Sequence, residues 1–164
     1  MGPLSNTAYL IGYIFSNVLA ILFLFAAFKR SKLARLLFFL LFAWAFGTNY
    51  YVSHHQPEAY LEYADASLPF YRNFINGWFK DHIKEMVTLI AVGQATIAVG
   101  MLLKGWWVKL ACVGAIIFLL AIAPLGLYAA FPFSLTASAA AYFILRKDDL
   151  NFIWRLRKFT AAVD

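Results

Sequence analysis

The sequence predicts an all-α fold: a polytopic membrane bundle of five transmembrane helices, with the N-terminus outside and the C-terminus in the cytoplasm. Composition is the first observation, because 63% of the 164 residues are hydrophobic and only 13% are charged. Soluble domains are about half apolar and about a quarter charged. The second observation is that several apolar runs approach the ~20 residues that a helix needs to cross a bilayer. The third is the placement of the basic residues, which gives the orientation.

The first predicted span, at about residues 8–28, has no basic residue before it and no small-x-small cleavage site after it. We therefore interpret it as a retained helix and not as a cleaved signal peptide. The second span follows a basic linker at about residues 33–52, and the third follows a long polar stretch at about residues 82–103.

The fourth and fifth predicted spans, at about residues 107–129 and 132–145, share an almost continuous apolar run. Pro124, Gly126 and Pro132 are the reasons to divide this run, because proline and glycine interrupt helices. The resulting organisation is a single bundle over residues 1–148 with an outer loop at 53–81, followed by a basic, amphipathic cytoplasmic tail at 149–164.

The lysines and arginines lie mostly on one side of this layout. The larger group comprises Lys29, Arg30, Lys32, Arg35, Lys104, Lys109, Arg146, Lys147, Arg155, Arg157 and Lys158, and the smaller group comprises Arg72, Lys80 and Lys84. Positive charge marks the cytoplasmic side of a membrane protein, so the loops after spans one, three and five are predicted to be cytoplasmic. This placement accounts for the net charge of +6 without a nucleic-acid partner.

The predicted outer loop is amphipathic. Its apolar and aromatic residues include Tyr60, Tyr63, Phe70, Tyr71, Phe74, Ile75 and Phe79. Such a segment suits two roles: it anchors on the outer leaflet, or it caps the bundle over an aromatic-lined cavity that holds an apolar ligand.

The candidate site residues gather at the same outer end. His54 and His55 end the second span, and His82 opens the third. At ~100° per residue, His82 and Glu85 lie on one face of the third span. Ionisable groups within spans are functional candidates, although the helix dipole and interfacial water also favour an acid such as Glu85 near a helix N-terminus.

Uncharged polar residues extend this site into the spans. Thr96 shares the face of Glu85 three turns deeper, whereas Gln94 points to the opposite face and is expected to bond another helix. Asn17, Thr48 and Asn49 suit interhelical hydrogen bonds. The predicted ligand-binding residues are Glu85, His82, Thr96, Asn49, His54 and His55.

A metal site is not predicted. No His-x-x-x-His or His-Glu-x-x-His spacing occurs, and the adjacent His54 and His55 point in diverging directions on a regular helix. Cys112 is the only cysteine and lies in an apolar run, which excludes an internal disulfide or a Cys-x-x-Cys pair.

Two stretches carry a resemblance to a known family. AFGTNYYVSHHQPEAYLEYA (residues 45–64) and GQATIAVGMLLKGWWVKLACVGAIIFLLA (residues 93–121) resemble the first helix end and the following hairpin of DoxX-like membrane proteins. The resemblance covers about residues 33–148 and leaves the first span as an addition to a four-helix core. Gln94 stands where the family often has an acid, which puts carboxylate chemistry there in doubt.

This resemblance implies a four-helix membrane bundle in a bacterial inner membrane, with a role that varies among relatives. Some relatives are subunits associated with quinone-linked sulfur oxidation, some act with oxidative-stress proteins, and distant ones bind or isomerise sterols. Fold alone does not fix function.

Three function hypotheses remain open. The leading one is an accessory membrane protein that binds a lipid, a quinone or a partner protein at its outer half. The second is an intramembrane enzyme in which Glu85 and His82 act as an acid/base pair on a lipophilic substrate. The third is a structural subunit of a larger respiratory assembly. Membrane lipid is the expected surrounding, and a membrane-protein partner or a second copy of the chain remains an option.

Overall fold

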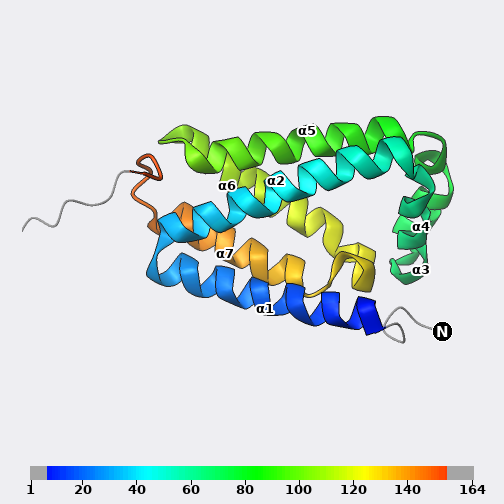
Figure 1. The fold of residues 1–164 in the computed structure, drawn as a ribbon, viewed down its shortest axis with the longest axis horizontal. Helices are drawn as coiled ribbons and strands as arrows, with labels where there is room; N and C mark the ends of the chain where they lie inside the picture. Colours follow the sequence, from blue (N-terminus) through cyan, green and yellow to red (C-terminus); the bar gives the residue numbers. More distant parts are fainter. Residues whose placement is uncertain (1–6, 155–164) are drawn as a thin grey trace, which may run out of the picture.

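The computed structural model describes residues 7–154, and this range is helical with no β-strand. Five long helices lie side by side (Figure 1), and shorter α- and 3₁₀-helices connect two pairs of them. The long helices are α1 (Thr7–Lys29), α2 (Ser31–His55), α5 (Ile83–Leu102), α6 (Trp106–Ile122) and α7 (Phe133–Lys147). The short ones are η2 (Pro57–Glu62), α3 (Tyr63–Ala66), α4 (Pro69–Asn76), η3 (Trp78–Asp81) and η4 (Ala123–Ala129).

Four of the described segments have the length and apolarity of membrane spans: α1, α2, α5, and α6 together with η4. The fifth expected span corresponds to α7, which has 15 residues. At 1.5 Å per residue α7 is about 22 Å long, which is shorter than the ~30 Å hydrocarbon core. The first described residues of α1 and the last of α7 lie at opposite ends of the bundle (Figure 1).

The core is built where α2 packs on α5 and α1 packs on α7, with α6 contacting both α5 and α7. Its largest fully buried apolar side chains are Phe38, Phe42, Met101, Leu119 and Ile144. Small residues allow the helix backbones to approach each other. On α7 the fully buried small residues are Ser134, Ala137, Ala140 and Ala141.

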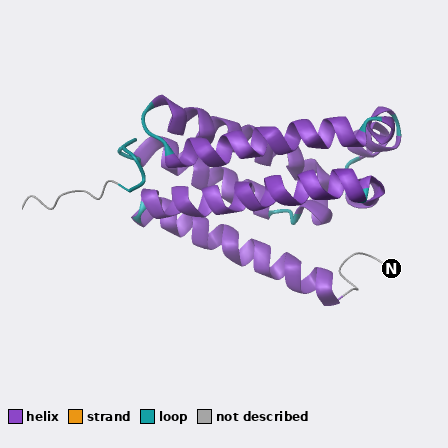
Figure 2. Cartoon of the chain, turned by 45° about the horizontal axis from the view of Figure 1, so that its top comes forward, coloured by secondary structure: helices purple, strands orange, loops and turns teal. Residues whose placement is uncertain are grey.

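The outside of the bundle is apolar, as the surface of a membrane-spanning protein must be. Ile11, Phe25, Leu89 and Ile117 are each more than 60% exposed. Helix α1 contributes many of these exposed side chains and diverges from the other helices toward its N-terminal end (Figure 2).

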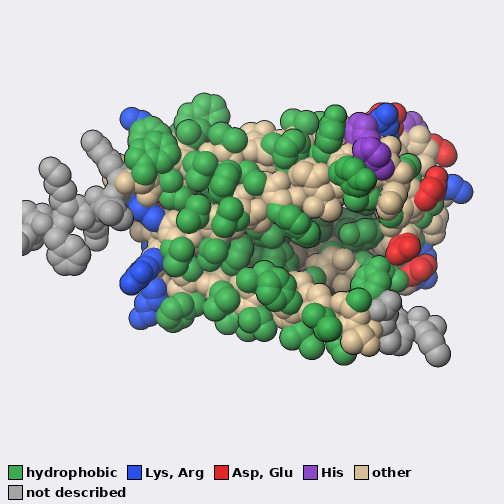
Figure 3. Space-filling view, in the orientation of Figure 1, with side chains coloured by type: hydrophobic (Ala, Val, Ile, Leu, Met, Phe, Trp, Pro, Cys, Tyr) green, Lys and Arg blue, Asp and Glu red, His purple; other side chains and the backbone are tan. Residues whose placement is uncertain are grey.

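Charge is divided between the two ends of the molecule (Figure 3). In this view Lys and Arg side chains gather at the end where α1 meets α2, and the visible acidic and histidine side chains, with a few Lys or Arg among them, gather at the end formed by α3 and α4. The two ends of the bundle therefore differ in charge.

Arg35 departs from its expected place. As one of the basic residues that mark the cytoplasmic side, it is expected in the loop after the first span, but the turn between α1 and α2 is the single residue Arg30, and Arg35 lies inside α2 with a fully buried side chain. Its Nε donates to the Met101 carbonyl oxygen at 2.8 Å, and its Nη1 lies 2.9 Å from Oδ1 of Asp148, whose side chain is also fully buried.

The same guanidinium donates to two further carbonyl oxygens, of Leu103 and Asn151. Arg35 therefore joins the start of α2, the end of α5 and the segment after α7 at the basic end of the bundle. The rest of the predicted tail, residues 155–164, lies outside the described residues.

The predicted outer loop folds over the opposite end of the bundle. Its α3 contacts η4, and the backbone N–H of Leu68 donates to the Pro124 carbonyl at 3.0 Å. Gly126 has a φ of +69° and faces the carbonyl oxygen of Ala66 so closely that a Cβ at this position would collide with it. We call the short helices η2, α3, α4 and η3 the roof of the bundle. The close approach of Gly126 and Ala66 holds this roof against η4.

Candidate functional site

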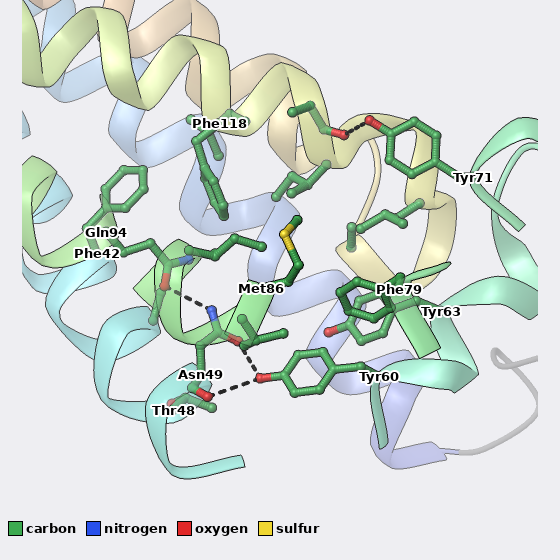
Figure 4. Close-up of a pocket in the computed structure, with 18 of the residues that line it drawn as sticks. Phe42, Thr48, Asn49, Tyr60, Tyr63, Tyr71, Phe79, Met86, Gln94 and Phe118 are labelled. Carbon is green, nitrogen blue, oxygen red and sulfur yellow. Dashed lines mark hydrogen bonds between the residues drawn. The ribbon is translucent and has the colours of Figure 1, made fainter. Parts of the chain in front are cut away.

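A cavity of about 520 Å³ lies beneath this roof, between α2, α5 and α6 (Figure 4). Its walls are mostly aromatic and aliphatic side chains, among them Phe42, Phe118 and Met86, and Tyr63 and Phe79 come from the roof. Among the described residues, no Asp, Glu, Lys, Arg or His side chain lines it. An apolar pocket with a few convergent polar groups is the usual form of a small-molecule site.

The polar groups form one chain of hydrogen bonds across the cavity wall (Figure 4). The Tyr60 hydroxyl donates to Oδ1 of Asn49 at 2.8 Å, and Nδ2 of Asn49 donates to Oε1 of Gln94 at 2.9 Å. Asn49 and Gln94 meet because α2 packs along α5, and Tyr60 reaches Asn49 from η2. These hydrogen bonds thus link the roof to α2 and α5.

Gln94 is the deepest member of this chain and is only 2% exposed. Its Oε1 is occupied by Asn49, and within residues 7–154 its Nε2 has no protein hydrogen-bond partner. In Figure 4 the Nε2 group lies on the cavity side of the Gln94 amide. The cavity therefore contains an amide N–H group that a bound molecule can satisfy.

Tyr60 stays neutral over a wide pH range. Burial, together with a smaller effect of the nearby Tyr63, raises its pKa to about 12. Since only the neutral phenol can donate, this shift preserves the hydrogen bond from Tyr60 to Asn49 at every physiological pH.

A second hydrogen bond attaches the roof to α6. The Tyr71 hydroxyl, from α4, donates to the Ala121 carbonyl oxygen in the last turn of α6 at 2.6 Å. Beside it, Ile75 and Phe79 are buried against Ile83 and Val87 of α5. The roof is therefore attached to helices on two sides of the cavity.

The cavity reaches the flank of the bundle. Figure 3 shows a recess below α2, toward the end where α3 and α4 lie. Trp44 of α2 lines the cavity and is 68% exposed, and Phe133 lines it from the start of α7. If the long helices cross a membrane, this recess faces lipid.

The histidines predicted for the site lie outside the cavity lining. Nδ1 of His54 and of His55 each lies 2.8 Å from the backbone carbonyl oxygen one turn earlier in α2. His82 stacks on the Trp78 ring, with 4.3 Å between centroids, and its Nδ1 lies 2.9 Å from the Trp78 carbonyl oxygen. In the described part of the chain, no three His, Cys, Asp or Glu residues are grouped so as to hold a metal ion.

The other predicted residues divide between the two faces of α5. Glu85 and Thr96 are exposed and do not line the cavity, and the Thr96 hydroxyl donates to the Val92 carbonyl oxygen of its own helix at 3.0 Å. Gln94 occupies the opposite, buried face and bonds another helix, as the helical geometry predicts. Of the six predicted ligand-binding residues, Asn49 alone lines this cavity.

Tyr60 and Gln94 line the cavity but are not among the predicted ligand-binding residues. Gln94 carries a usable signal, since it is a lone amide in the middle of an apolar span and therefore needs a partner. Tyr60 carries none, because its contact with Asn49 depends on how the roof folds back.

The chain matches no protein-family model, no curated protein and no solved structure. The resemblance to DoxX-like proteins therefore stays a prediction.

Proposed function

We propose that this protein binds a lipophilic small molecule, such as a lipid or a quinone, in the cavity between α2, α5 and α6. The observation that supports this proposal is the cavity itself: about 520 Å³ of space, apolar walls, and one buried amide turned inward. Space of this size with apolar walls and few polar groups is the form that small-molecule sites usually take.

The proposed orientation places the cavity in the outer half of the bundle. In this proposal α7 completes five crossings, with its short length compensated by its flanking Arg146 and Lys147, which reach the headgroups. The separation of charge between the two ends supports an N-terminus outside and a C-terminus in the cytoplasm (Figure 3).

Photolabelling tests the binding proposal. A twelve-carbon alkyl diazirine, incorporated into nanodiscs with the purified protein and irradiated, is expected to label cavity residues such as Met86 and Phe118, with the labelled positions identified by mass spectrometry. Ile90→Trp fills the cavity from α5 and is expected to abolish this labelling.

The matched control lies one residue away on the same helix. Leu89 is 67% exposed and does not line the cavity, so Leu89→Trp adds the same bulk on the outer face and is expected to preserve labelling. Equal labelling of both variants at Met86 and Phe118, or labelling confined to outward-facing residues, would show that the cavity does not receive lipophilic molecules.

Cysteine accessibility tests the orientation. Cys112 is fully buried and therefore a silent background for membrane-impermeant maleimides. Glu58→Cys, in η2, is expected to react in intact cells, and Lys104→Cys, in the turn before α6, is expected to react only after permeabilisation. Reaction of both sites from the same side would contradict the five-crossing arrangement.

A further inference from the structure

We infer that the ligand is uncharged and carries a hydrogen-bond-accepting oxygen, such as a carbonyl, which the Nε2 amide of Gln94 binds. This inference rests on the proposed function, because it specifies what the same cavity selects. It starts from a property of membranes: hydrocarbon is as apolar as the cavity walls, so transfer of a ligand from lipid gains little from the hydrophobic effect. Selection among lipophilic molecules must then come from shape and from polar contacts.

The direction of the hydrogen-bond chain determines which polar group is left for a ligand. The Tyr60 hydroxyl lies 3.4 Å from the backbone oxygen of Asn49 as well as 2.8 Å from its Oδ1. In the shorter of these two contacts the phenol is the donor and Oδ1 of Asn49 is the acceptor. Asn49 must then present Nδ2 to Gln94, and Gln94 must present Oε1 to Asn49, which leaves Nε2 turned toward the cavity.

This leftover group is a donor and has no acceptor function, because amide nitrogen carries two N–H groups and no available lone pair. Without an acceptor in these apolar surroundings, this donor carries the penalty of an unsatisfied polar group. A ligand oxygen removes this penalty. In the hydrocarbon region a ligand carbonyl has no donor either, so both partners gain when they meet.

The rest of the lining argues against a charged ligand. None of its described residues carries a charge, and the histidines and acids at this end of the bundle point elsewhere. A carboxylate or an ammonium brought into this cavity would lose its hydration without finding a counter-charge, which is strongly unfavourable.

The test compares four twelve-carbon competitors that differ only in their polar group. Dodecane, 2-dodecanone, dodecanoate and dodecylammonium are added at equal membrane mole fractions to the diazirine-labelling assay. The nanodiscs are made of ether-linked phosphatidylcholine, which has no ester carbonyl to compete for Gln94. In the wild-type protein, 2-dodecanone is expected to suppress cavity labelling about fivefold more effectively than dodecane, the factor for one net hydrogen bond.

Two changes locate the preference. Gln94→Leu alone would leave Nδ2 of Asn49 without its acceptor at the cavity wall, so the variant is Gln94→Leu/Asn49→Leu, which removes both amides, and the ketone is then expected to compete no better than dodecane. Thr96→Val removes a polar group from the exposed face of α5 and is expected to leave the fivefold preference intact. A ketone preference that survives in Gln94→Leu/Asn49→Leu, or a charged competitor that exceeds the ketone, would overturn the inference.

An infrared measurement on the wild-type protein makes the test independent of the folding of any variant. The carbonyl stretch of ¹³C-labelled 2-dodecanone is expected to shift to lower frequency in protein-containing nanodiscs relative to empty ones, because the carbonyl accepts a hydrogen bond. An unshifted carbonyl band, together with labelling that all four competitors suppress equally, would disprove polar recognition while leaving cavity binding intact. Absence of cavity labelling by the diazirine would instead disprove the proposed function.

Discussion

Replacing Arg35 with methionine is expected to lower the free energy of unfolding by about 3–5 kcal/mol, the usual cost of removing one partner from a buried ion pair. The side chain is 0% exposed and makes hydrogen bonds to Asp148 and to the carbonyl oxygens of Met101, Leu103 and Asn151. Methionine fills a similar volume, so the loss is electrostatic and polar and does not come from an empty space.

The size of this loss is expected because Arg35→Met leaves the Asp148 carboxylate buried without its counter-charge. Asp148 retains one donor, the Leu150 N–H at 2.7 Å from its Oδ1, while its Oδ2 already lacks a protein hydrogen-bond partner. A buried carboxylate with one donor is poorly compensated. Replacing both residues, as in Arg35→Met/Asp148→Leu, removes the stranded charge, so the double variant is expected to lose less stability than the sum of the two single variants.

The assay is unfolding of the purified protein in mixed micelles, with the free energy taken from the denaturant dependence of helicity or tryptophan fluorescence. Lys109→Met is the control, because Lys109 is an exposed cation at the same end of the bundle and its loss is expected to change stability by no more than about 0.5 kcal/mol. A loss in Arg35→Met no larger than in this control, or additive effects at Arg35 and Asp148, would show that the buried pair does not stabilise the fold in this way.

Three further outcomes are expected. Gly126→Ala should lower the free energy of unfolding by about 1–3 kcal/mol in the same assay, because the positive φ of Gly126 and the adjacent carbonyl leave no room for a Cβ. Gly93→Ala, which places a Cβ with no atom within 4 Å, should be neutral or slightly stabilising, and equal losses in the two variants would contradict this. Gly100→Ala should cost about 1–3 kcal/mol of the same free energy, because its Cβ would lie 2.8 Å from that of Ala111 and force α5 and α6 apart, and an unchanged denaturation midpoint would refute it. Since the folded-state pKa of Tyr60 is raised from 10.0 to about 12, its contribution to stability should be complete below pH 10 and lost as the pH rises through 12; absorbance at the phenolate band, compared with Tyr60→Phe, would refute this if the phenol ionised near pH 10.

The helices of this protein are largely readable from its sequence. Apolar runs long enough to cross a bilayer must be helical, because lipid offers no partner to an open backbone. Four of the five long helices begin and end within about three residues of their expected spans, whereas α6 ends at Ile122 and the 3₁₀-helix η4 occupies the rest of the fourth span. The burial and interhelical bonding of Gln94 were also predictable, because the position of a residue around a helix follows from its number alone.

The predicted polar site illustrates what helix position does not give. His54, His55 and His82 lie at the expected end of the bundle, but their rings turn back to carbonyl oxygens of the preceding turn. Side-chain direction depends on such local partners and on neighbouring aromatic rings. The positions of these histidines in the sequence therefore predict the end of the bundle at which they lie, but not whether their side chains face a cavity.

Contacts between distant segments are the part that only folding establishes. Asn49 and Gln94 are 45 residues apart, and Arg35 and Asp148 are 113 residues apart. Hydropathy and charge fix which residues enter the membrane and which end each charge occupies, because each residue is transferred into lipid or water individually. They leave open how far each helix slides and rotates against its neighbours. This register is what buries Arg35 in an ion pair with Asp148 and what places Gln94 in the cavity wall.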